Sequence, residues 1–78
     1  MSLSLDKVPI GSRVKVKDIS GSSFKRRLMD MGIVPGSEIS IEGKAPLGDP
    51  IEILVRGYRL TLRKNEAMCV LVQSKEVD

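Results

Sequence analysis

The chain has 78 residues, of which 41% are hydrophobic, and a formal net charge of +3. One domain fits this length, and a domain so small buries only roughly 60% of the surface that its unfolded chain exposes. Histidine, the commonest general base, is absent, and the only aromatic residues are Phe24 and Tyr58, so catalysis by histidine and extensive stacking on nucleic-acid bases are both excluded.

The first predicted elements are an extended lead-in and a strand. Residues 5–11 form the lead-in, which ends in a turn at residues 9–12. The strand follows at residues 13–19, where Val14 and Val16 face one side and basic residues face the other.

A short helix is predicted next, because Phe24, Leu28 and Met31 recur at the spacing of one helical face. Ser22 or Ser23 can cap its N-terminus. The helix has about two turns, which is below the length that is stable alone, so it depends on packing.

Gly32 is predicted to end this helix with a positive φ, the left-handed conformation that glycine adopts without strain. Ile33 can make the hydrophobic contact that accompanies such a cap. Pro35 prevents the helix from continuing.

Three strands are predicted after the helix. Ile39 and Ile41 alternate with polar residues in the first, and residues 51–55 and 60–62 form the other two. A broad connection, residues 43–50, separates the first from the second.

The last two of these strands are predicted to form a hairpin with the two-residue loop Gly57-Tyr58, which has glycine at its first central position. The apolar residues of both strands then share one face. The predicted cross-strand pairs are Arg56 with Arg59, Val55 with Leu60, Ile53 with Leu62, and Glu52 with Arg63.

The C-terminal part is predicted to complete a small barrel. A tight turn at residues 64–67 leads to a fifth strand at residues 68–72, and residues 73–78 form a frayed tail. Five short antiparallel strands, one short α-helix and regularly spaced turns indicate an all-β fold in a single domain, residues 1–78. Closing the sheet into a barrel removes most exposed strand edges.

The location expected for the protein is cytoplasmic. No segment approaches the ~20 apolar residues that a membrane-spanning helix needs. Residues 1–6 have neither the basic nor the long apolar region of a signal peptide. The single cysteine, Cys69, excludes an internal disulfide and fits a reducing compartment.

With its residues in this order, the sequence resembles the ferrous iron transport protein A (FeoA) family over about residues 5–72. The run Pro46-Leu47-Gly48-Asp49-Pro50, placed between Pro35-Gly36 and Gly57, is the most specific part of the resemblance. The other residues that carry it are Leu28, Gly32, Ala45, Ile51, Leu60, Leu62, Arg63, Glu66, Ala67, Val70 and Val72.

The resemblance implies an SH3-like barrel without catalytic activity. It also implies a cytosolic accessory role beside the FeoB ferrous iron transporter, a membrane protein that carries a cytosolic GTP-binding domain. A similar barrel occurs at the C-terminus of iron-dependent repressors, but this chain lacks the DNA-binding and dimerisation segments of such a repressor.

No metal ligand, cofactor site or catalytic residue is predicted. Ferrous sites usually combine histidine with carboxylates, and histidine is missing. Asp49 is interpreted as a turn residue that bonds its own backbone, and Cys69 as a small, largely buried apolar residue. The acidic residues are scattered along the chain, at Asp30, Glu38, Glu42, Asp49, Glu52 and Glu66.

The predicted helix has a charge pattern that suggests a contact surface. Lys25, Arg26 and Arg27 crowd its first turn and Asp30 lies near its end, which opposes the helix dipole by roughly 0.3–1 kcal/mol for each misplaced charge. Met29 points away from the apolar stripe, beside the basic residues. A solvated basic face is the alternative explanation.

The hairpin tip has a second cluster of like charge, with Tyr58 between Arg56 and Arg59. Mixtures of arginine, methionine and tyrosine are typical of protein contact surfaces. The candidate protein-binding residues are therefore Lys25, Arg26, Met29, Arg56, Tyr58 and Arg59.

The favoured hypothesis is a non-enzymatic cytoplasmic protein that docks on the cytosolic GTP-binding region of an FeoB-type transporter and modulates it, touching the membrane only through that partner. The first alternative is a basic barrel that binds nucleic acid, which the scarcity of aromatics and the modest charge oppose. The second is a metal-sensing module related to the repressor C-terminal domains.

Overall fold

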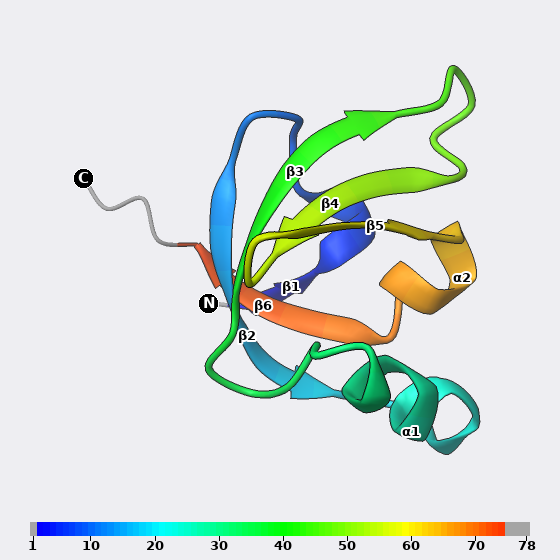
Figure 1. The fold of residues 1–78 in the computed structure, drawn as a ribbon. Coiled ribbons are helices and arrows are strands. Elements are labelled where there is room, and N and C mark those ends of the chain that lie inside the picture. The colour runs from blue at the N-terminus through cyan, green and yellow to red at the C-terminus, as the bar shows by residue number, and fades with distance from the viewer. Residues whose placement is uncertain (1, 75–78) are drawn as a thin grey trace.

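A computed structural model describes residues 2–74 as one antiparallel sheet with short helices beside it (Figure 1). The strand order in the sheet is β1-β6-β2-β3-β4-β5. The elements are β1 Ser2–Ser4, a 3-10 turn Leu5–Lys7, β2 Arg13–Ile19, α1 Ser22–Asp30, β3 Glu38–Lys44, β4 Ile51–Val55, β5 Tyr58–Leu62, α2 Lys64–Ala67 and β6 Val70–Ser74.

The predicted fold class, a small SH3-like barrel of antiparallel strands with one main helix, is confirmed. Two details differ. Ser2–Ser4 forms an additional edge strand, because its backbone pairs with β6 from Ser2 opposite Gln73 to Ser4 opposite Leu71. The tight turn expected at residues 64–67 is a four-residue helix, α2.

The predicted closure of the sheet is wrong for the described residues. The sheet has two ends, β1 and β5, and no strand within residues 2–74 bridges them. The fifth predicted strand also begins later than expected, at Val70, since α2 ends at Ala67 and the next two residues form a turn. Of the predicted frayed tail, Gln73 and Ser74 belong to β6, and residues 75–78 lie outside the described residues.

The core fills the inside of the curved sheet. Strand β2 contributes Val14, Val16 and Ile19, because the pairing with β6 shifts between Val16 and Asp18 and so returns Ile19 to the inner face. Leu28 of α1 covers the core from one side. The largest side chains with under 2% exposure are Leu5, Leu28, Ile33, Ile39, Ile41, Ile51, Ile53, Val55, Leu62, Val70 and Val72.

The β4–β5 hairpin has a different register from the predicted one. Its two-residue loop is Arg56-Gly57, with φ of 52° and 82°, so Val55 pairs with Tyr58 rather than with Leu60. Two successive positive φ angles give the loop the twist that matches the flanking strands, and arginine adopts one of them here. The register differs by two residues, so every side chain keeps its predicted face.

The C-terminus of α1 ends as predicted. Gly32 has φ 94° and donates its N–H to the Met29 carbonyl at 3.0 Å, while Ile33 donates to Leu28 at 3.0 Å. These two bonds are a Schellman cap, and the fully buried Ile33 side chain is its hydrophobic contact. The N-terminal prediction is wrong, because Gly21, not Ser22 or Ser23, is the capping residue.

Candidate docking surface

The outer face of α1 exposes the three helix residues predicted to bind a partner. Leu28 is fully buried, which fixes the orientation of the helix and turns Lys25, Arg26 and Met29 outward. Met29 remains 41% exposed although it is apolar. These three residues and Asp30 line one shallow hollow. We call Lys25, Arg26 and Met29 the helix patch.

The hairpin tip exposes the other three predicted residues. Arg56 lies in the left-handed turn, and Tyr58 and Arg59 begin β5. Tyr58 is 69% exposed, so an aromatic side chain is presented to solvent between two cations. We call Arg56, Tyr58 and Arg59 the tip patch.

One residue of the tip patch lies close to the end of α1. A Cβ built on Gly32, just after α1, would lie 3.7 Å from Cδ of Arg56. The tip patch therefore borders the C-terminal end of α1. Within residues 2–74, no hydrogen bond or ion pair joins Lys25 or Arg26 to Tyr58 or Arg59. The structure thus describes the helix patch and the tip patch as two separate surfaces, of which the tip patch reaches the end of α1 through Arg56.

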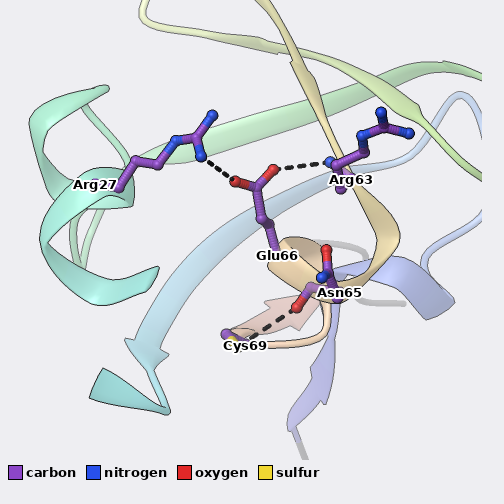
Figure 2. Close-up of polar contacts among 5 residues, drawn as sticks. All are labelled: Arg27, Arg63, Asn65, Glu66 and Cys69. Carbon is purple, nitrogen blue, oxygen red and sulfur yellow. Dashed lines mark hydrogen bonds and ion pairs between the residues drawn. The ribbon is translucent and has the colours of Figure 1, made fainter. Parts of the chain in front are cut away.

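The sequence analysis missed Glu66, the most buried charged residue among residues 2–74. Only 4% of Glu66 is exposed, and Figure 2 shows its two carboxylate oxygens in separate contacts. Oε1 accepts the backbone N–H of Arg63 at 2.9 Å, and Oε2 lies 3.3 Å from Nη1 of Arg27. This carboxylate both caps the start of α2 and holds a side chain of α1.

Arg27 therefore has a different role from its basic neighbours. It lies in the last turn of α1, not in the first as predicted, and there the helix dipole favours a cation. Its side chain crosses from α1 to Glu66 (Figure 2). Only the glutamate half of a capping box is present, because the N-cap residue Arg63 has no side-chain acceptor, so the sequence carried no capping-box signal for Glu66.

Replacing Glu66 with alanine is expected to lower the free energy of unfolding by about 1 kcal/mol, because the N-terminal cap of α2 is lost. Arg27→Ala is the matched control. Its side chain is 67% exposed, so solvent screens the ion pair and the loss is expected to be only about 0–1 kcal/mol. Urea unfolding of both variants measures the difference. A larger loss for Arg27→Ala than for Glu66→Ala would contradict the capping role.

Asp49 has a partner that was not predicted. Its Oδ1 accepts the backbone N–H of Lys64 at 3.0 Å, so it ties the connection before β4 to the start of α2 instead of bonding its own backbone. Cys69 is partly buried against the core, and its thiol lies 3.5 Å from the Asn65 carbonyl (Figure 2).

The described residues hold no cluster of three acidic, cysteine or histidine side chains of the kind that could bind a metal ion. The same part of the chain contains no helix long and apolar enough to cross a membrane.

Comparison with known proteins decides the family. A model of the FeoA domain matches residues 3–74. The chain belongs to the FeoA domain family. The resemblance predicted from the PLGDP run and its flanking glycines is thereby confirmed.

Solved structures of the family share the whole fold. The FeoA-like protein of Clostridium acetobutylicum is 51% identical, with a TM-score of 0.92 over 99% of this chain and 91% of that one. FeoA of Stenotrophomonas maltophilia, solved in complex with zinc and described as a prokaryotic SH3 domain protein, is 29% identical. Its TM-score is 0.81 over 91% of this chain and 89% of that one.

A curated relative joins the domain to a transporter. It is the Fe(2+) transport protein A/Fe(2+) transporter FeoB fusion protein of Porphyromonas gingivalis, 28% identical over 72 residues. The match covers 91% of this chain, which spans only 8% of the length of that relative.

Proposed function

We propose that this FeoA domain is a non-enzymatic cytoplasmic accessory of ferrous iron uptake. It docks on the cytosolic GTP-binding region of an FeoB-type transporter and modulates that region. The observation that carries the proposal is the Porphyromonas gingivalis fusion protein, in which a related domain and FeoB form one chain. A domain that is covalently joined to a transporter in one organism can reach the same transporter by non-covalent docking in another.

The surface of the domain supports a docking role. The helix patch and the tip patch both combine cations with an exposed apolar or aromatic side chain, Met29 and Tyr58. Arginine, methionine and tyrosine are enriched at protein interfaces. A docked domain modulates its partner by binding two conformations of that partner with different affinity, which requires no catalytic residue of its own.

Charge reversal on the helix patch is expected to break the docking. The double variant Lys25→Glu/Arg26→Glu should fold with a stability within ~0.5 kcal/mol of the parent, since both positions are exposed. Its affinity for the isolated cytosolic region of FeoB should fall at least about tenfold, because removing complementary charge weakens both encounter and complex. Titration calorimetry with the purified cytosolic region of FeoB measures the affinity of the parent and that of the double variant.

The matched control is Lys15→Glu/Lys17→Glu, which changes the net charge equally at two exposed positions of β2. An equal loss of affinity in both variants would show a general charge effect and contradict the helix patch as the contact. Arg56→Glu/Arg59→Glu tests the tip patch in the same assay. If neither patch variant binds more weakly than the parent, the docking surface lies elsewhere on the domain.

A further inference from the structure

Strand β5 has a free edge. It is the last strand in the sheet order and pairs only with β4 within the described residues (Figure 1). No backbone hydrogen bond from a turn or loop of residues 2–74 reaches Tyr58–Leu62. A strand edge of this kind presents a row of donors and acceptors that an extended chain can pair with.

The hairpin register identifies which backbone groups face outward. Val55 and Tyr58 flank the two-residue loop and are therefore a hydrogen-bonded pair. Bonded and non-bonded pairs alternate along antiparallel strands, so Arg59 opposite Leu54 and Thr61 opposite Glu52 are non-bonded pairs. The N–H and C=O groups of Arg59 and Thr61 consequently point away from β4.

The side chains along this edge indicate what kind of strand could pair with it. Arg59 and Thr61 are exposed on the outer face of the sheet, and Arg63 continues that face in an extended conformation. Figure 2 shows the guanidinium of Arg63 pointing away from Glu66, so it is free of that carboxylate. On the other face Leu60 is only half-buried, and an added strand would cover it.

A second copy of this chain does not fit the edge. Two β5 strands paired edge to edge would bring together Arg56, Arg59 and Arg63 of both copies. Like charges across neighbouring strands are destabilising, and charged edges are a common protection against self-association. The same charges favour an acidic strand.

We propose that the free edge of β5 binds an extended acidic segment of a partner protein, which adds to the sheet as a further strand. The segment has the pattern acidic–apolar–polar–apolar–acidic. The acidic residues lie opposite Arg59 and Arg63, and an apolar residue covers Leu60. The central residue is uncharged, because it lies opposite Thr61, and Glu52 of β4 occupies the same face of the sheet on the other side of Thr61. The inference rests on the proposed function only in taking the partner to be a protein.

The test uses the purified chain and two fluorescent peptides, so no transporter is needed. The peptides contain Glu-Val-Thr-Val-Glu and Lys-Val-Thr-Val-Lys. The pattern reads the same in both directions, and each peptide can therefore pair in either orientation. Fluorescence anisotropy should show saturable binding of the glutamate peptide that weakens with salt, and no saturable binding of the lysine peptide.

Two variants at one position separate backbone pairing from charge attraction. Thr61→Pro removes an outward N–H, a change that edge strands tolerate, and should weaken binding at least about tenfold. Thr61→Val keeps the N–H and should bind like the parent. Arg59→Glu should abolish binding of the glutamate peptide. If Thr61→Pro does not fold, N-methyl groups on the threonine and both valines of the peptide remove the backbone donors that either orientation would use, while the protein stays unchanged.

Equal binding by Thr61→Pro and Thr61→Val, or full binding of the N-methylated peptide, would overturn strand addition. Binding of neither peptide would overturn the proposal entirely and leave the edge arginines with a protective role only. Neither result bears on the proposed function, which fails instead if the helix-patch and tip-patch variants retain full affinity for the transporter region.

Discussion

Replacing Leu62 with alanine is expected to lower the free energy of unfolding by about 2–5 kcal/mol. Leu62 is completely buried and pairs with Ile51, also completely buried, near the centre of the core. Truncation removes apolar contacts and leaves a cavity that a small, tightly packed domain refills only in part. Urea or thermal unfolding followed by circular dichroism measures the loss.

Leu47→Ala is the matched control for this prediction. Leu47 is 89% exposed in the connection before β4, so the same truncation there should change stability by less than ~0.5 kcal/mol. The two variants remove the same atoms, so the expected difference between their losses of stability depends only on the burial of the side chain. Comparable losses for Leu47→Ala and Leu62→Ala would show that the described packing of β5 is incorrect.

Replacing Gly32 with valine is expected to cost at least about 1–2 kcal/mol, and the melting temperature should fall by several degrees. Gly32 has φ 94°, a conformation that L residues adopt only with strain, and valine is among the least tolerant. The loss would not come from crowding, because an added Cβ meets only Cδ of Arg56, at an ordinary contact distance of 3.7 Å.

Gly32→Asn tests whether the lost stability comes from backbone strain at positive φ. Asparagine adopts the left-handed conformation more easily than valine does. The asparagine variant should therefore melt between the parent and the valine variant. An unchanged melting temperature for Gly32→Val would contradict the Schellman cap at the end of α1.

Much of the fold could be predicted from local patterns. The helix end at Gly32 depends on a glycine, a following apolar residue and a proline within four positions, and the structure confirms it. The alternation in β4 and β5 correctly identified the buried face. It could not fix the register, because a shift of two residues leaves every side chain on the same face. The observed register depends on Arg56, which adopts a positive φ in the loop although arginine does not favour that conformation.

The candidate site could be predicted only where exposure follows from periodicity. Lys25, Arg26 and Met29 are outward because Leu28 is inward, and that relation lies within one helix. The contact between Arg27 and Glu66 joins residues far apart in the chain, so no local pattern indicates it. The free edge of β5 could not be predicted either, because the strands of a closed barrel and of an open one show the same alternation of apolar and polar residues.

The position of β6 has a consequence for synthesis of the chain. Strands β3, β4 and β5 are neighbours in both sequence and sheet, so they can pair as soon as Leu62 leaves the ribosome. Strand β6 lies between β1 and β2, and its last paired residue is Ser74. The edge of β2 that pairs with β6 thus stays unpaired until Ser74 has left the ribosome. During that interval this strand edge is open to aggregation and to capture by chaperones.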